Sequence, residues 1–142
     1  MLSYFNYHKT NCFFITNNNK DVLAIDAGWP CTLNEYIRNL KQIGFKYNNI
    51  KYAVVSHFHL DHAGLYSEFI DSGICCLVLS SQLNAIKQME STINNHKEYI
   101  YYKKIDQNKL IIKNLEETEN FLCDNGFSVK IESLQSHSDD HI

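Results

Sequence analysis

Apolar residues near the start of the chain fall into two short runs separated by a polar turn. The runs are Cys12–Thr16 and Asp21–Ile25, and three consecutive asparagines at positions 17–19 lie between them. Short runs of this kind, rich in aromatic and branched residues, are typical of strands, and asparagine tolerates the backbone angles of tight turns. The pattern therefore predicts a β-hairpin over residues 12–25.

The period of the apolar residues then changes, which predicts a helix over residues 32–43. Apolar side chains recur every three or four positions and so share one face of a helix. These residues are Leu33, Ile37, Leu40 and Ile43. Thr32 and Glu35 have the spacing of a capping box, in which each side chain accepts a hydrogen bond from a free backbone N–H, and Gly44 is a typical stop residue.

Strand-like and helical patterns alternate along the rest of the chain. The predicted strands are 51–55, 74–79 and 127–131, and the predicted helices are 65–70, 81–93 and 114–126. Residues 94–113 show no clear period. Alternation of this kind is typical of the α/β class. We find no linker, repeat or low-complexity tract, so we expect a single domain over residues 1–142.

Composition and charge narrow the function classes. The chain has 142 residues, 44% of them hydrophobic, and a net charge of -3, so it offers no general attraction for nucleic acid or an anionic membrane. We see no apolar stretch long enough to span a bilayer and no signal peptide at the N-terminus. The five cysteines form no Cys-x-x-Cys pair, which favours reduced thiols and a cytoplasmic protein.

A cluster of metal-binding side chains follows the predicted strand 51–55. It comprises His57, His59, Asp61 and His62. Imidazole nitrogens and carboxylate oxygens are zinc ligands, and His57 and His59 point to the same side of an extended segment. The alternative is a chance group of solvated histidines, but a His-x-His-x-Asp-His pattern arises by accident in roughly one chain in a thousand of this length.

The segment 54–64, Val-Val-Ser-His-Phe-His-Leu-Asp-His-Ala-Gly, resembles the signature of the metallo-β-lactamase superfamily. Three further segments match that family in order. They are Thr10–Ile15, which resembles its opening strand, Leu23–Gly28, which resembles its Asp-Thr-Gly turn, and His137–Asp140, which resembles its Gly-His-Ser/Thr segment. The resemblance implies an αββα sandwich, of which this chain would supply mainly the N-terminal sheet and its helices.

The resemblance also implies a set of site residues. His57, His59 and His137 would hold one Zn²⁺, and Asp61 and His62 would supply part of a second site. Asp61 would also be catalytic, orienting the attacking water and passing a proton to the leaving group. Asp26 would hydrogen-bond and orient the histidine loop, as metal ligands generally require. The other histidines, at positions 8, 96 and 141, and Asp140 are left as solvated residues.

Two departures from the family pattern lead to further expectations. Ser136 stands where the family has a glycine before its third histidine, which would strain a turn. Family members also continue past this segment with the remaining second-site ligands and the second sheet. An apolar sheet face left bare beyond about 600 Å² favours association. We therefore expect a partner: a second copy of the chain or a separate C-terminal half.

Together these patterns predict a zinc-dependent hydrolase that acts on a small molecule with an ester, thioester, lactam or related bond. The alternative is a truncated, inactive remnant, or half of a split enzyme, that binds at most one metal. A third hypothesis is a metal-binding interaction module.

Overall fold

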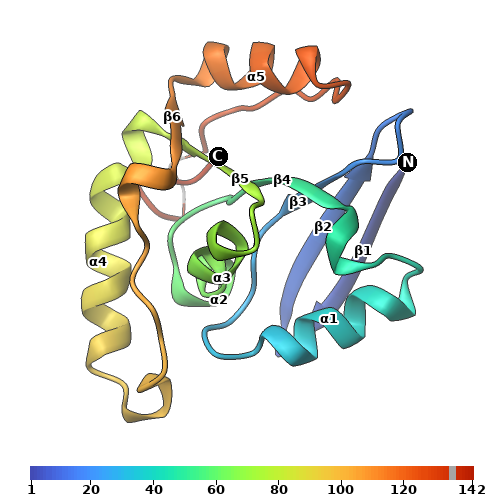
Figure 1. The fold of residues 1–142 in the computed structure, drawn as a ribbon. Coiled ribbons are helices and arrows are strands. Elements are labelled where there is room, and N and C mark those ends of the chain that lie inside the picture. Colours follow the sequence, from blue (N-terminus) through green and yellow to red (C-terminus); the bar gives the residue numbers. More distant parts are fainter. Residues whose placement is uncertain (135–136) are drawn as a thin grey trace.

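The structure, a computed structural model, describes residues 1–134 and 137–142 and contains one six-stranded sheet. Its strands follow one another across the sheet in chain order (Figure 1). They are β1 (Leu2–Tyr7), β2 (Thr10–Thr16), β3 (Val22–Ile25), β4 (Ile50–Val54), β5 (Cys75–Leu79) and β6 (Ile111–Lys113). The first three strands are antiparallel, and β3 to β6 are parallel.

Helices make the crossovers between the parallel strands. They are α1 (Leu33–Gln42), α2 (Leu60–Ala63), α3 (Tyr66–Asp71) and α4 (Leu83–Asn94). A fifth helix, α5 (Leu115–Asp124), follows β6. Short 3-10 turns lie at Tyr47–Asn49, Ser80–Gln82, Lys97–Tyr99 and Gln107–Lys109. Parallel strands need such crossovers, and their carboxyl ends meet at one edge of the sheet, where α/β folds place their sites.

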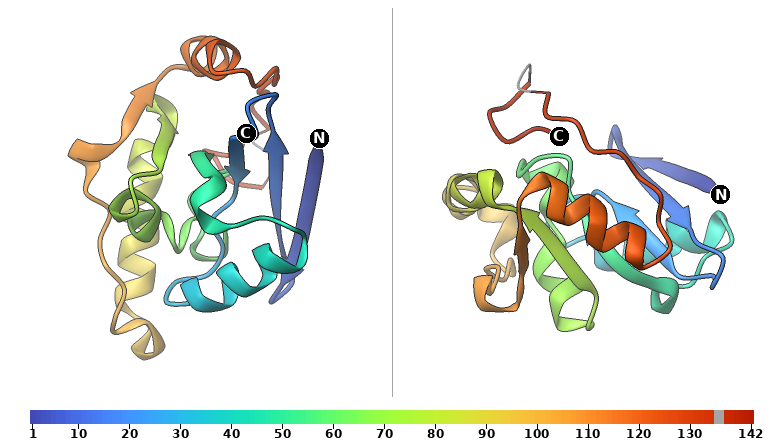
Figure 2. Two further views of the ribbon diagram at one scale, coloured as in Figure 1. Left: turned by 45° about the vertical axis from the view of Figure 1, so that its right-hand side comes forward. Right: turned by 90° about the horizontal axis from the view of Figure 1, so that it is seen from above.

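The two faces of the sheet bury different helices. Tyr36 of α1, Phe69 of α3 and Ile86 of α4 belong to the larger core on one face. On the other face, Leu23 and Leu77 pack with residues of α5 and of the segment that follows it. Figure 2 shows this segment returning alongside α5. Alternate residues of the strands therefore contribute to two separate cores, as the pleat of a sheet requires.

The structure has the predicted mixed α/β class and most of the predicted elements. The hairpin forms as β2 and β3, with Asn17 Oδ1 accepting the backbone N–H groups of Asn19 and Asp21. The prediction of a capping box at Thr32 is wrong. The Thr32 hydroxyl donates instead to the carbonyl oxygen of Trp29 at 2.7 Å, because the turn before α1 folds back onto the helix start.

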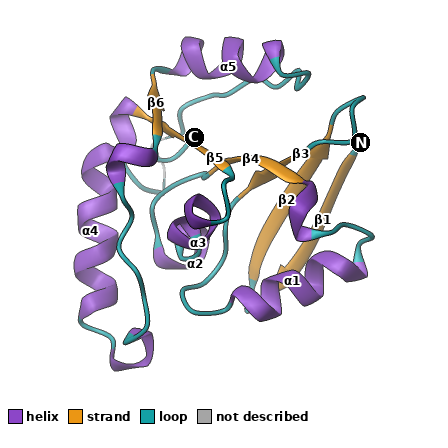
Figure 3. Cartoon of the chain, viewed as in Figure 1, coloured by secondary structure: helices purple, strands orange, loops and turns teal. Residues whose placement is uncertain are grey.

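Three strand predictions differ from the structure. The local pattern predicts no strand over residues 2–7, yet they pair along their whole length with β2. It also predicts none within residues 94–113, where β6 pairs with β5. The predicted strand at 127–131 is a loop (Figure 3). The backbone N–H of Ile131 donates to a side-chain oxygen of Glu119 at 2.7 Å, not to a neighbouring strand. Its apolar residues still pack against the sheet, so alternation alone did not specify a ladder.

The sheet face that we expected to be bare is partly covered. Leu122 and Phe127 are buried against it, and a groove of about 300 Å³ remains between the sheet and the C-terminal segment. Its apolar lining includes Ile25, Val54 and Ile131. None of the helices in the described part of the chain has the length and hydrophobicity that crossing a membrane would require.

Candidate metal centre

Three segments meet at the carboxyl ends of β3 and β4. They are the turn after β3, the histidine loop after β4, and residues 137–142 at the end of the chain. Backbone hydrogen bonds fix the first two together: the Ala27 N–H donates to the His62 carbonyl at 2.6 Å, and the Gly64 N–H to the Gly28 carbonyl at 2.7 Å. Gly28 has a φ of +64°, and a Cβ there would overlap the hydroxyl of Tyr7, so this turn requires glycine.

The imidazoles of His57, His59 and His137 converge on one point. One nitrogen from each lies within 4.8 Å of the other two. The ring centroids are 4.4 Å apart for His57 and His59, 4.8 Å for His57 and His137, and 5.1 Å for His59 and His137. His57 is buried, whereas the other two rings are exposed. Three imidazoles around an open position are the ligand set of a catalytic zinc site.

The surroundings of His57 leave it ready to bind a cation. Its Nε2 is buried and has no hydrogen-bond partner among the described residues. Its Nδ1 lies 3.0 Å from the Ser56 hydroxyl, which donates its proton to Asp26 and can therefore accept one from Nδ1. Burial, followed by the nearby rings of His62 and His59, lowers the pKa of His57 to about 4. At neutral pH its Nε2 thus carries a free lone pair, as a metal ligand must.

Asp61 and His62 lie beside this group but bind each other. The His62 Nε2 is 3.2 Å from a carboxylate oxygen of Asp61, and its Nδ1 is 2.8 Å from Asp26. Burial alone lowers the pKa of His62, but the hydrogen bonds to Asp26 and Asp61 outweigh it and raise the pKa to about 9. Burial alone raises the pKa of Asp61. The hydrogen bonds from His62 and the Thr10 hydroxyl outweigh this effect and lower the pKa to about 2. A second cation would have to displace the His62 proton.

Asp26 connects the two parts of the site. One carboxylate oxygen accepts the Ser56 backbone N–H at 2.7 Å, and the other accepts the Ser56 hydroxyl at 3.1 Å and His62 Nδ1 at 2.8 Å. The residue is 4% exposed, and its φ is 71°. Aspartate is one of the few residues that adopt this left-handed conformation. Asp26 therefore occupies the place from which it can orient the histidine loop.

Asp140 and His141 differ from their predicted solvated state. Asp140 is 8% exposed and accepts the backbone N–H of Phe58 at 2.6 Å. The His141 ring lies 4.9 Å from the His57 ring, and its Nδ1 is buried without a partner in the described chain. In the sequence, the only indication that these two residues belong to the site is their position shortly after His137. Ser136, the predicted site of strain, lies outside the described residues.

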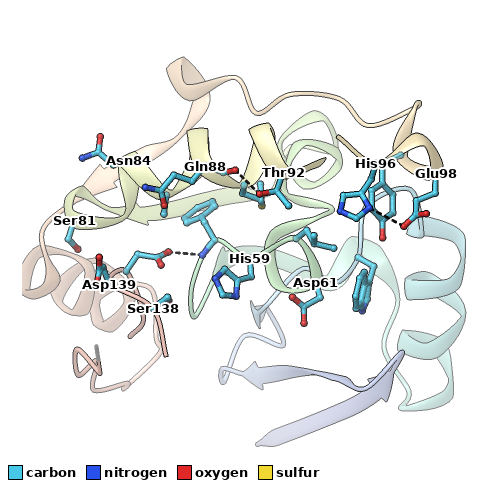
Figure 4. Close-up of a pocket in the computed structure, with 17 residues that line it drawn as sticks. His59, Asp61, Ser81, Asn84, Gln88, Thr92, His96, Glu98, Ser138 and Asp139 are labelled. Carbon is cyan, nitrogen blue, oxygen red and sulfur yellow. Dashed lines mark hydrogen bonds and ion pairs between the residues drawn. The ribbon is translucent and has the colours of Figure 1, made fainter. Parts of the chain in front are cut away.

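A groove of about 1030 Å³ opens over the candidate centre. Figure 4 shows Asn84, Gln88 and Thr92 of α4 along one side of it and His59 and Asp61 on the other. Asp61, Glu98, Asp139 and Asp140 contribute acidic groups, and the described lining residues include no lysine or arginine. The groove is therefore large enough for a small molecule, and its charged lining is acidic apart from the histidines.

Comparison with known proteins supports the fold. The profile of the metallo-β-lactamase superfamily matches residues 7–118. A β-lactamase from Chitinophaga pinensis superposes with a TM-score of 0.60 at 19% identity, over 78% of this chain and 42% of its own. A metallo-β-lactamase from Cronobacter sakazakii gives a TM-score of 0.54 at 24% identity, over 61% of this chain and 35% of its own.

A subclass B3 metallo-β-lactamase from a soil metagenome gives a TM-score of 0.52 at 27% identity, over 60% of this chain and 32% of its own. No curated protein matches the chain. The match to the superfamily profile covers more than half of the sequence, so the chain belongs to the metallo-β-lactamase superfamily. Its six-stranded sheet and helices correspond to part of that fold, and it spans about a third of the length of most of these solved structures.

Proposed function

We propose that this chain carries the metal centre of a zinc-dependent hydrolase, with His57, His59 and His137 as ligands. The observation that carries the proposal is the buried, unpartnered Nε2 of His57 within 4.8 Å of ligand nitrogens from the other two rings. A zinc ion bound to three histidines lowers the pKa of a water from about 15.7 to about 7 and polarises the substrate's carbonyl oxygen.

The side chains around the centre have complementary roles in the proposed reaction. The Asp61 carboxylate is ionised at neutral pH, so it can accept a hydrogen bond from the attacking water, orient it and later hand a proton to the leaving group. Ser56 and Asp26 hold His57 in the tautomer whose Nε2 carries the lone pair. The groove beside α4 would hold the rest of the substrate.

The chemistry of the groove favours an ester, thioester, lactam or related small-molecule bond over a phosphodiester. Phosphate binding relies on basic side chains, whereas the groove presents amides, hydroxyls and carboxylates. The net charge of -3 acts in the same direction. We propose that the protein is cytoplasmic and binds no nucleic acid or membrane. We also propose that a second copy of the chain, or a separate C-terminal half, binds the groove lined by Ile25, Val54 and Ile131.

A second candidate function is a one-metal protein without turnover, either a remnant or half of a split enzyme. The observation in its favour is the pairing of Asp61 with His62 and of His62 with Asp26. These contacts satisfy the groups that would otherwise contribute to a second metal site. A chain in this form would hold zinc at the three histidines only.

Metal analysis followed by hydrolysis assays separates the two functions. The chain is loaded with zinc and dialysed, bound metal is measured per chain, and ester, thioester, lactam and phosphodiester substrates are assayed. Stoichiometric zinc with turnover that is lost in His59→Ala supports the hydrolase, and zinc without turnover supports the second candidate. His8→Ala is the matched control, because His8 is an exposed histidine paired with Glu35 outside the centre. A wild-type chain that binds no zinc would refute both.

A further inference from the structure

We propose that Asp140 and Gln82 are positioning residues that hold the His137 segment against the histidine loop and so assemble the three-histidine centre. The inference rests on the proposed metal centre. His59 is separated from His137 by β5, β6 and the four helices α2 to α5, so nothing local to either residue brings them together. The contacts of residues 140–142 with the β4 end of the site supply that link.

Asp140 binds the loop between its two histidines. Its Oδ2 accepts the backbone N–H of Phe58 at 2.6 Å, and Phe58 lies between His57 and His59 in the sequence. The Asp140 side chain is buried, and the bond is charge-assisted, which makes it stronger than an ordinary backbone contact. This one carboxylate therefore fixes the position of the third-histidine segment relative to the backbone that carries the first two ligands.

Gln82 ties the same segment to the rest of the fold. Its side chain is 1% exposed, and its Nε2 donates to the carbonyl oxygens of Asp140 at 3.1 Å and Val55 at 3.2 Å. Its Oε1 accepts the Leu79 backbone N–H at 3.1 Å. One buried amide thus joins the ends of β4 and β5 to residue 140. A buried amide that uses both ends in this way is costly to remove and specifies a single arrangement.

A last backbone bond completes the link, since the Ile142 N–H donates to the Ser56 carbonyl at 2.9 Å. Asp140, Gln82 and Ile142 together hold both sides of the centre before any cation binds. Such preorganisation lowers the entropic cost of recruiting the exposed His137 ring. The ligand atoms that converge on one point come from His57, His59 and His137, and Asp140 is not in that group, so Asp140 acts through the ligands.

The first test is the affinity of the metal centre. Zinc affinity is measured by competition with a chromophoric chelator for the wild-type chain, Asp140→Asn and Asp140→Ala. Asparagine keeps an oxygen that can accept the Phe58 N–H, so we expect a small loss for Asp140→Asn and a loss of about 10- to 100-fold for Asp140→Ala. The visible absorption of the Co²⁺ form should lose intensity in the same order as the coordination loosens.

Glu119→Ala is the matched control. Glu119 of α5 also accepts a backbone N–H from the C-terminal segment, at 2.7 Å from Ile131, but this contact involves neither a candidate ligand nor the histidine loop. We expect its zinc affinity and Co²⁺ spectrum to match those of the wild type. If Asp140→Ala binds zinc as tightly as Glu119→Ala and gives the wild-type spectrum, Asp140 does not position the centre and the inference is overturned.

The second test uses the metal-free chain, so that its outcome does not depend on the proposed function. Hydrogen exchange is measured on the peptide that contains Phe58 in the wild type, Asp140→Ala, Gln82→Met and Glu119→Ala. We expect faster exchange in Asp140→Ala and Gln82→Met and unchanged exchange in Glu119→Ala, the control. Unchanged exchange in all variants overturns the inference. If the Phe58 N–H is protected in the wild type but the chain binds no zinc, the proposed function is refuted. Asp140 and Gln82 then have no role in metal binding.

Discussion

Asp26 is the residue whose replacement tests the site most directly. Asp26→Asn keeps one side-chain oxygen, which can still accept the Ser56 backbone N–H, and it keeps a residue type that tolerates the φ of 71°. It removes the negative charge and replaces the oxygen that accepts the Ser56 hydroxyl and His62 Nδ1. The substitution therefore changes the chemistry of this buried contact with little change in shape.

The cost follows from the two hydrogen bonds that are lost. A hydrogen bond to a charged group contributes about 1.5–3 kcal/mol, and both of the lost bonds are made to the Asp26 carboxylate. His62 is charged as well, because its pKa of about 9 keeps it protonated at neutral pH. We expect Asp26→Asn to lower the free energy of unfolding of the metal-free chain by about 3–6 kcal/mol. Zinc affinity should fall by about 10- to 100-fold, because Ser56 no longer fixes the His57 tautomer.

Urea unfolding of the metal-free chain measures the first quantity, and chelator competition measures the second. Asp21→Asn is the matched control: Asp21 lies at the opposite end of β3, and its side chain makes no hydrogen bond within residues 1–134 and 137–142. We expect the control to change neither quantity. Wild-type zinc affinity in Asp26→Asn would contradict the assignment of Asp26 as the residue that orients the histidines.

Three further predictions concern the turn, the last helix and pH. Gly28→Ala should prevent stable folding, seen by circular dichroism, because its Cβ would overlap the hydroxyl of Tyr7; a folded variant would contradict the close approach. Asn114→Ala should cost about 1 kcal/mol in urea unfolding, because Asn114 Oδ1 accepts the Glu117 N–H at 2.9 Å at the start of α5; an unchanged midpoint would contradict the cap. Stability of the metal-free chain should be greatest near pH 6.5. The lowered pKa of His57 contributes stability above pH 6.5 that is lost as pH falls through about 4, and the raised pKa of His62 contributes stability below pH 6.5 that is lost as pH rises through about 9. Urea midpoints across this range in the wild type and His57→Gln, whose acid limb should be shallower, measure the effect.

Much of the candidate site was predictable because its residues are close in the sequence. His57 and His59 are two positions apart at the end of a strand, so their approach depends only on the local backbone. The convergence of His137 came from the family resemblance, since no local pattern places it. A position near the chain end predicts a solvated Asp140. Its burial depends on the contact with Phe58, which exists only once β4, the 3-10 turn at Ser80–Gln82 and the C-terminal segment have packed together.

The sequence by itself determined the short-range features: the hairpin, α1, the strands β4 and β5, and the order of ligands in the histidine loop. These follow from periodicity and turn residues, which act over a few positions. Only the tertiary structure decided that residues 2–7 pair with β2, that 127–131 remains a loop, and that Gln82 joins three segments. The physical reason is that a backbone N–H or carbonyl group forms its hydrogen bond with a group that lies near it only after the chain has folded. The neighbouring residues in the sequence do not specify this partner.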